Sequence, residues 1–292
     1  MITVSGLTKK YGDRTVVDQV SFELEPGTVT GFLGPNGAGK TTTMRMITGL
    51  VPATSGSALV DGRPYASLSN PGAVMGTLLD AGAVHPGRSG RKHLRLLADT
   101  IGVPARRVDD VLERVGLTDA ARRRIGGYSL GMRQRLGIAG ALLAEPPVLM
   151  FDEPANGLDP EGIRWMRDLL RGHAARGGTV LLSSHILSEV EHTVDRLLVI
   201  GAGRIVADGS VAELLGSDGT HVRAVDPAAL ARSLEAAGFH VQHGSDGVLV
   251  VAGTDPSQVG AVAAAGGHAL IDLRPAERGL EDLFFQLTSA AA

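Results

Sequence analysis

Hydrophobic and polar residues alternate in short runs along the first 33 residues of the chain. Alternation with a period of two is typical of β-strands, and turn residues at 11–13 and at Pro26-Gly27 separate the runs. The last run leads into a glycine-rich loop, and a helical pattern then extends from Thr41 to about Leu50. The predicted strands are Ile2–Val4, Thr15–Val17, Val20–Leu24 and Val29–Leu33.

Farther along the chain the hydrophobic period becomes helical, and buried strands and helices then alternate. From Ser89 to Leu117 apolar residues recur every three or four positions, and a second helix begins after Pro104. The apolar run 147–151 ends in two acidic residues, as a buried parallel strand does. Strands alternating with helices indicate a three-layer α/β core. Further predicted elements are the strands Val180–Ser183 and Leu197–Ile200 and the helix Gly162–Ala175.

The pattern changes near residues 216–219, where we expect a second domain to begin. The remaining residues predict the order strand, helix, strand, strand, helix, strand, which is typical of a small split-βαβ domain. We therefore expect a first domain at 1–215 and a C-terminal domain at 217–292. The predicted elements are strands at 221–225, 240–242, 248–251 and 270–273, helices at 227–237, 258–265 and 280–287, and a turn at Asp246-Gly247.

Composition and charge disfavour several classes of function. The 292 residues include 28 Lys and Arg against 31 Asp and Glu, so a protein that mainly coats nucleic acid is disfavoured. No cysteine is present, which excludes disulfides, thiolate metal sites and cysteine nucleophiles. The N-terminus has no secretory pattern, and no apolar run reaches the ~18 residues that cross a bilayer. We expect a chain that is soluble by itself and that another chain must hold at any membrane where it acts.

The glycine-rich loop carries the first chemical motif, because residues 34–41 fit G-x-x-x-x-G-K-[ST] at every fixed position. Glycines let successive backbone N–H groups face phosphates, Lys40 would reach the β- and γ-phosphates, and the Thr41 hydroxyl would complete a Mg²⁺ shell. An ordinary glycine-rich turn is the alternative, and the position between a predicted strand and helix disfavours it. The candidate nucleotide-binding residues are Gly34, Pro35, Asn36, Gly37, Ala38, Gly39, Lys40, Thr41 and Thr42.

Two carboxylates, Asp152 and Glu153, follow the apolar run that ends at Phe151. Ligands of open α/β sheets bind at this end of the strands. Asp152 suits the Mg²⁺ shell, directly or through water, and Glu153 suits a general base that orients the attacking water. Taken alone, such a pair is more often a solvated strand end. The upstream phosphate loop reverses that preference.

Five motifs in this order resemble an ATP-binding cassette (ABC) ATPase over residues 1 to about 215. The likeness extends to the nucleotide-binding subunits of the bacitracin- and daunorubicin-resistance exporters, including the C-terminal segment 280–284. It implies an α/β fold, namely a P-loop NTPase cassette with a parallel-sheet core, antiparallel β and helical subdomains (the helical one near 85–135), plus a small α+β C-terminal domain. The motifs after the phosphate loop are residues 128–135, 152–154, 157–160 and 183–185.

The resemblance implies roles for particular residues. Tyr11 matches the aromatic residue that stacks on adenine, although an exposed hairpin tyrosine has the same pattern. Ser129 and Gly131 match the signature loop, which closes over the γ-phosphate bound to the opposite subunit; elsewhere such a serine is usually an N-cap. His185 matches the histidine that contacts the γ-phosphate, whereas a lone histidine after a strand is usually structural. Asp159 matches a loop that communicates between the two sites.

The chain departs from the family pattern at two positions. Leu130 replaces the first glycine of the signature, so we expect an ordinary backbone conformation or some strain there. No glutamine occurs between Gln19 and Gln134, so the usual magnesium-contacting glutamine is replaced, with Asp80 in its place. Asp80 could hold Mg²⁺ through water as a third metal-site residue beside Thr41 and Asp152, or it could be a solvated turn residue.

The resemblance also implies cofactors, partners and location. The cofactors are ATP and Mg²⁺, and the partners are a second copy or paired cassette, closing head to tail on ATP, and a separately encoded integral-membrane permease. The permease would hold the chain at the cytoplasmic face of the cell membrane, with residues 88–117 supplying part of the docking surface. No nucleic-acid partner is expected. The cargo stays open among drug-like, lipid and peptide molecules.

Two other functions compete with transport. The first is a non-transport ABC ATPase that acts as a clamp on ribosomes or DNA. Such proteins generally carry two cassettes in one chain, a long coiled coil or a metal-binding insertion, and this chain has one cassette, no heptad run and no cysteine. The second is a regulator that binds ATP without useful turnover. Glu153 and His185 disfavour that reading, whereas the replacement at Asp80 mildly favours it.

Overall fold

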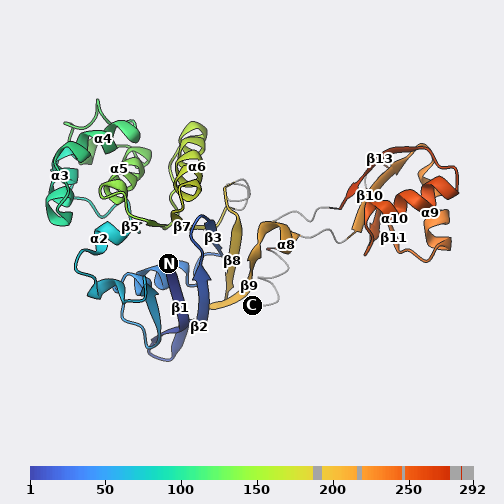
Figure 1. Cartoon of the computed structure of the whole chain (residues 1–292), viewed down its shortest axis with the longest axis horizontal. Helices are drawn as coiled ribbons and strands as arrows, with labels where there is room; N and C mark the ends of the chain where they lie inside the picture. The colour runs from blue at the N-terminus through green and yellow to red at the C-terminus, as the bar shows by residue number, and fades with distance from the viewer. Residues whose placement is uncertain (187–192, 216–218, 245–246, 277–283, 285–292) are drawn as a thin grey trace. The chain divides into compact units, whose positions relative to one another are not determined.

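A computed structural model describes residues 1–186, 193–215, 219–244, 247–276 and 284 of the chain. The chain forms two compact units, one mainly of Met1–Val211 and the other of Ala212–Leu283 (Figure 1). None of the helices in the described part of the chain combines the length and apolar character needed to cross a membrane.

A six-stranded sheet forms the centre of the first unit, with the strand order β5-β6-β7-β3-β8-β9. Neighbouring strands from β5 to β8 are parallel, and β9 is antiparallel to β8. Every residue of β3, β6 and β7 is buried, as expected for parallel strands covered on both faces. The predicted parallel-sheet core is therefore confirmed. The strands are β3 (Val29–Leu33), β5 (Met75–Leu78), β6 (Val148–Phe151), β7 (Thr179–Ser184), β8 (Arg196–Gly201) and β9 (Arg204–Ser210).

An antiparallel sheet of three strands, in the order β2-β1-β4, lies beside the core. Two short predicted strands are in fact parts of one strand, β2, so the predicted break was wrong. The chain there forms a β-bulge, in which Gln19 has a φ of +52° and the pairing shifts by one residue between Leu7–Val20 and Lys9–Val17. The strands are β1 (Ile2–Tyr11), β2 (Arg14–Leu24) and β4 (Ser55–Val60).

Helices pack on both sheets. α1 contacts β1, β2 and β4, whereas α6 contacts β3 and β7. α1 ends at Ile47, before the predicted end at Leu50, because the backbone turns at Gly49, whose N–H donates to the Met46 carbonyl at 3.0 Å. The helices and short turns of this part are α1 (Lys40–Ile47), η1 (Tyr65–Ser67), α2 (Pro71–Val74) and α6 (Pro160–Ala175), and α8 (Val211–Leu215) follows β9 where the second unit begins.

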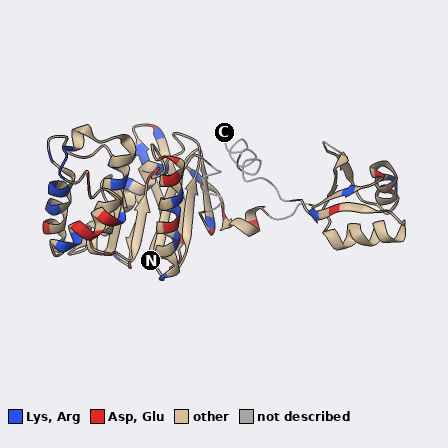
Figure 2. Ribbon diagram, turned by 90° about the horizontal axis from the view of Figure 1, so that it is seen from above, with Lys and Arg blue, Asp and Glu red and all other residues tan. Residues whose placement is uncertain are grey.

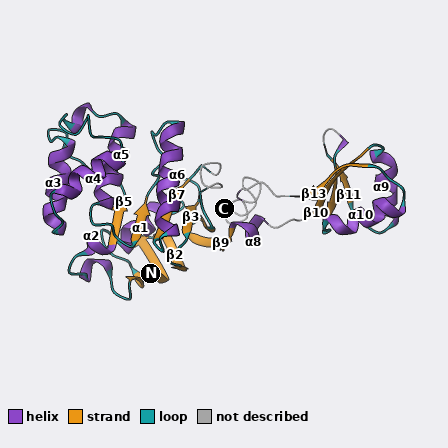
Figure 3. Cartoon of the chain, turned by 45° about the horizontal axis from the view of Figure 1, so that its top comes forward, coloured by secondary structure: helices purple, strands orange, loops and turns teal. Residues whose placement is uncertain are grey.

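Three further helices, α3, α4 and α5, pack on one another where the helical subdomain is expected (Figure 3). The Ser89 hydroxyl accepts from the Lys92 N–H at 3.3 Å and caps α3. α4 follows Pro104, in agreement with the pattern. α5 also contacts β5, so this helix joins the helical subdomain to the core sheet. The elements are α3 (Gly90–Ile101), α4 (Arg106–Arg114), η2 (Ile125–Gly127) and α5 (Leu130–Leu142).

The second unit confirms the predicted βαββαβ order. Its sheet is antiparallel throughout, in the order β11-β12-β10-β13, and α9 and α10 supply the apolar core on one side. The Asp226 and Asp255 carboxylates cap the two helices. Asp246 of the predicted turn lies outside the described residues, as does the predicted helix 280–287 apart from Phe284. The elements are β10 (Gly219–Ala224), α9 (Pro227–Ala236), β11 (Val241–His243), β12 (Leu249–Ala252), α10 (Pro256–Ala265) and β13 (Leu270–Pro275).

Gly76 allows the backbones of β5 and α5 to approach closely, because a Cβ there would overlap the carbonyl oxygen of Ala141. We expect Gly76→Ala to lower the free energy of unfolding by about 2 kcal/mol, since the two backbones must separate. Gly127→Ala is the control, because a Cβ at Gly127 meets no atom within 4 Å and its φ is not positive. Urea unfolding followed by circular dichroism compares the two, and equal stabilities would contradict this explanation.

Candidate nucleotide-binding site

The glycine-rich loop lies at the carboxyl edge of the parallel sheet, between β3 and α1. β6 and β7 end at the same edge, and Asp152, Glu153 and His185 directly follow these two strands. Gly39, just before α1, has a φ of +110°, which residues with side chains rarely adopt. A Cβ there would also lie 2.9 Å from the Val16 carbonyl oxygen. The loop therefore requires glycine at this position.

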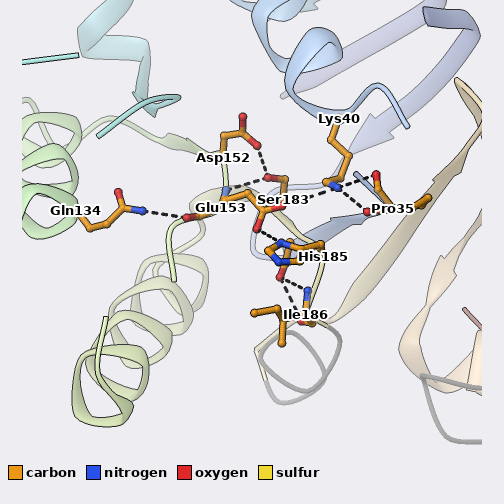
Figure 4. A network of polar contacts seen from close by, with 10 residues as sticks. Pro35, Lys40, Gln134, Asp152, Glu153, Ser183, His185 and Ile186 are labelled. Atoms are coloured by element: carbon orange, nitrogen blue, oxygen red, sulfur yellow. Dashed lines mark hydrogen bonds and ion pairs between the residues drawn. The ribbon is translucent and has the colours of Figure 1, made fainter. Parts of the chain in front are cut away.

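Lys40 places a buried cation inside this loop, with 6% of the residue exposed. Its ammonium donates to the carbonyl oxygens of Gly34 at 2.5 Å and Pro35 at 3.3 Å, and it lies 3.8 Å from a carboxylate oxygen of Glu153 (Figure 4). Burial lowers the pKa of the Lys40 ammonium, and the nearby carboxylates of Glu153 and Asp152 counteract that effect. Loop carbonyls and carboxylates thus hold this cation where phosphates would bind.

The backbone of Glu153 is held in a rare conformation. Its φ is +49°, in the left-handed region, at a cost of roughly 1–3 kcal/mol. Its N–H donates to the Ser183 hydroxyl at 2.9 Å, and its carbonyl accepts from the Gln134 side-chain amide at 3.0 Å. The Ser183 hydroxyl in turn donates to the Asp152 carboxylate at 2.5 Å. Two buried side chains, one from β7 and one from α5, therefore fix the backbone that carries the Glu153 carboxylate.

The Glu153 carboxylate lies between two nitrogen groups (Figure 4). One oxygen contacts Lys40, and the other lies 2.8 Å from Nδ1 of His185. The His185 side chain is 38% exposed, against 22% for Glu153, so the imidazole forms the outer side of the site. An ionised carboxylate only accepts hydrogen bonds, which suits it to orient a water molecule as a nucleophile.

A pocket of about 350 Å³ opens beside these groups. It includes most of the predicted phosphate loop together with Glu153. Arg14 and Val16, both from β2, also line it, and the sequence analysis did not identify them because strand residues carry no motif of their own. The lining residues are Arg14, Val16, Pro35, Asn36, Gly37, Gly39, Lys40, Thr41, Thr42 and Glu153.

Tyr11 is not among the residues that line this pocket. It lies at the end of β1, it is 52% exposed, and the Lys9 ammonium is 4.8 Å from the centroid of its ring. A ring in contact with one cation and solvent is available for stacking. Its adenine-binding role stays a prediction.

The signature residues also lie away from the pocket of their own chain. Ser129 caps α5, its hydroxyl accepting from the Met132 N–H at 3.1 Å, and Gly131 lies in the first turn of that helix. Leu130 has no positive φ, so the expected ordinary backbone is found, and 53% of this residue is exposed. Ser129 is exposed as well, whereas Gly131 is half-buried, and a Cβ there would lie 2.6 Å from the Gly157 carbonyl oxygen.

Asp159 and Asp80 each bind a nearby backbone N–H. The Asp159 carboxylate accepts from Gly162 at 2.8 Å and caps α6, and the Asp80 carboxylate accepts from Gly82 at 2.7 Å. Asp80 lines a separate groove of about 270 Å³ rather than the pocket at the phosphate loop. This groove lies between β5, α3 and α5, and its lining includes Tyr65, Asp80, His93, Leu97 and Ile101.

The donor chemistry at the sheet edge suits Mg²⁺. Thr41 contributes a hydroxyl to the pocket, and Asp152 contributes a carboxylate oxygen beside Ser183. Both are hard oxygen ligands of the kind that Mg²⁺ prefers, usually together with substrate phosphates and water. No cluster of three or more His, Cys, Asp or Glu side chains suited to a metal occurs within the described residues. Thr41 and Asp152 therefore suit a Mg²⁺ ion that a phosphate ligand also binds.

Comparison with known proteins gives two family matches. A family model described as "ABC transporter" matches residues 17–156, and a model for a domain of unknown function matches residues 218–281.

Individual relatives cover more of the chain. The uncharacterized ABC transporter ATP-binding protein YdbJ of Bacillus subtilis (strain 168) is 35% identical over 298 aligned positions, or 99% of this chain and 96% of YdbJ. The bacitracin transport ATP-binding protein BcrA of Bacillus licheniformis is 41% identical over 213 positions, or 71% of this chain and 69% of BcrA. A solved ATP-binding subunit of an ABC transporter superposes with a TM-score of 0.67 at 29% identity, covering 73% of this chain and 91% of that one.

Gln134 is expected to act as a positioning residue for Glu153. Gln134→Leu removes the donor to the Glu153 carbonyl at nearly constant volume, so we expect kcat for ATP hydrolysis to fall about tenfold or more through misplacement of the carboxylate. Nucleotide affinity, measured with a fluorescent ATP analogue, should stay within twofold. Gln242→Leu, on exposed β11, is the matched control. An unchanged kcat, or a loss confined to KM, would contradict the role.

Proposed function

The chain belongs to the family of ABC transporter ATP-binding subunits, and we propose that it hydrolyses ATP at the Lys40–Glu153–His185 site to power an exporter. The main observation behind this proposal is that the Glu153 carboxylate contacts both Lys40 of the phosphate loop and His185. The permease is proposed to be a separate chain. Relatives such as BcrA, named for bacitracin transport, support a drug-like, peptide or lipid cargo.

In the proposed reaction, Glu153 orients a water molecule for in-line attack on the γ-phosphorus. A phosphorus–oxygen bond forms to the water, and the bond to the oxygen that bridges the β- and γ-phosphates breaks. ADP and inorganic phosphate leave, and the proton of the water passes to Glu153 or to the phosphate. Lys40 neutralises charge on the phosphates, and His185 donates to the γ-phosphate from the outer side of the site.

Magnesium fits this site through Thr41 and Asp152, and it would neutralise charge on the β- and γ-phosphates. Ser183 keeps the Asp152 carboxylate oriented through the hydrogen bond of 2.5 Å. Asp80 lies in the groove beside α3, and we propose that its effect on the metal, if it has one, passes through a water molecule.

A second copy of the chain, or a paired cassette, is proposed to complete each ATP site. The start of α5 carries Ser129 and Gly131 outside the pocket of their own chain. The first turn of a helix favours anions, so this turn suits a γ-phosphate held by another subunit. Closure on ATP and reopening after hydrolysis would supply the two-state motion that drives transport.

The permease is proposed to dock at the groove between β5, α3 and α5. The groove is lined by apolar side chains such as Leu97 and Ile101, with the Asp80 carboxylate at one end of β5 and His93 on α3. Apolar linings with a few polar groups are typical of binding sites. A membrane subunit seated there would place the chain at the inner face of the cell membrane.

Glu153→Gln tests the assigned base. The amide keeps the size of the side chain but cannot accept a proton, so we expect the hydrolysis rate to fall at least about a hundredfold. ATP binding should persist. Phosphate release measures turnover, and Glu161→Gln, an exposed position in the first turn of α6, is the control. Steady-state hydrolysis that is unchanged in Glu153→Gln would show that another group is the base.

The Glu153→Gln chain should also elute as a dimer when Mg-ATP is present and as a monomer without it. Size-exclusion chromatography makes this comparison. Adding Ser129→Arg should abolish the dimer, because the larger cation fills the space of the γ-phosphate. The control Ser69→Arg changes an exposed serine and should leave the dimer intact. Elution that ATP does not alter would contradict a site shared between two copies.

A further inference from the structure

Positive charge is concentrated in one part of the chain. Residues 85–135 contain 12 Lys and Arg against 5 Asp and Glu, although the whole chain has a net charge of −3. The remainder of the chain therefore carries an acidic excess. Figure 2 shows Lys and Arg positions on the helices at the left of the view, where Figure 1 places α3. Such an asymmetry is typical of a surface that meets an anionic partner.

Four of these cations line one hollow. We call these four residues the basic face: Arg91, Lys92, Arg95 and Arg122. The hollow measures about 290 Å³, and no carboxylate lines it. Arg91 pairs with Asp109 and Arg95 with Asp99 outside the lining, whereas Lys92 and Arg122 form no ion pair with a described residue. All four are exposed. Lys92 and Arg122 are thus not held in an ion pair, although Arg91 and Arg122 also line a second pocket that includes Asp109, Glu113 and Asp119.

Four of the seven residues that line the hollow are cationic, which favours an anionic partner, and the hollow lacks the features of a nucleic-acid site. None of the residues that line the hollow has an aromatic ring, so no ring lies there to stack on a base. The acidic excess elsewhere would repel a long polyanion. Separate phosphate groups on a surface need no stacking ring, and they do not extend along the acidic remainder of the chain as a long polyanion would.

α3 relates the basic face to the proposed docking groove. His93, Leu97 and Ile101 line the groove, whereas Lys92 and Arg95 line the hollow on another side of the same helix. A helix with its side chains is only about 10 Å across, so a membrane subunit seated in the groove would bring phospholipids close to the basic face. Leu96, between the two sets, is 48% exposed.

We propose that the basic face binds the phosphate groups of anionic phospholipids at the inner membrane surface. The choice of a membrane rests on the proposed docking to a permease. Basic residues close to an anionic leaflet are attracted to it over a distance of about a Debye length. The contact would hold the helical subdomain against the membrane beside the permease.

Flotation of the full chain with lipid vesicles tests the proposal. We expect binding to vesicles of phosphatidylcholine with about one quarter phosphatidylglycerol, no binding to pure phosphatidylcholine, and weaker binding as salt rises. Lys92→Glu with Arg122→Glu should reduce the affinity at least tenfold. Arg164→Glu with Arg171→Glu, exposed on α6, makes the same change in net charge and should stay within twofold.

Several results would overturn the proposal. These are equal binding to both vesicle types, equal loss in the two double variants, and no loss in Lys92→Glu with Arg122→Glu. Binding to polyuridine that depends on these two cations, without vesicle binding, would assign the face to nucleic acid instead. If the reversed pair fails to fold, Lys92→Gln with Arg122→Gln gives the same test.

The vesicle measurement is independent of the ATPase. Neither double variant touches the nucleotide site, so hydrolysis should be unchanged in both. Loss of vesicle binding with normal hydrolysis and ATP-dependent dimers would refute only the lipid contact. Normal vesicle binding without hydrolysis or dimers would refute only the transport function.

Discussion

The buried ammonium of Lys40 is the charge around which the carboxyl edge of the sheet is organised. A cation withdrawn from water needs polar or anionic partners, and the carbonyls of Gly34 and Pro35 and the carboxylate of Glu153 supply them. These partners follow β3 and β6, and His185 follows β7. They meet only because the three strands are parallel and lie in the order β6-β7-β3. The pairing of these strands in the sheet therefore also brings the residues of the site together.

α5 connects that edge to the helical subdomain. The helix begins at Ser129, which caps it, and one turn later Gln134 donates to the Glu153 carbonyl. Glu153 is in a left-handed conformation, which persists only where the surroundings determine it. A shift of α5 therefore reaches the backbone of the carboxylate directly. Ser129 at the start of α5 and the backbone of Glu153 are therefore linked through one helix.

Sequence analysis and structure agree where the evidence is local. The spacing of residues 34–41 predicts a phosphate loop, and the apolar run before Glu153 predicts a buried strand that ends at the same edge. The contacts of Gln134 and Ser183 could not be predicted, because they join side chains from α5 and β7 to a third segment. Periodicity identifies elements but not which side chains of different elements meet. The bulge at Gln19 interrupts the alternation of apolar and polar residues, so the pattern predicts two strands. The pairing with β1 continues on both sides of the bulge, and this pairing is not visible in the pattern.

The net charge of −3 conceals the feature that would orient the chain at a membrane. Electrostatic forces at an anionic surface act over about 8 Å at physiological salt, so only residues on the facing surface contribute. Arg122 and Lys92 at the hollow are attracted, and the acidic excess elsewhere is repelled. Attraction and repulsion then act on different parts of the molecule. The position of the cations therefore determines how the chain is oriented at the membrane. A chain with the same composition but an even charge distribution would have no preferred orientation.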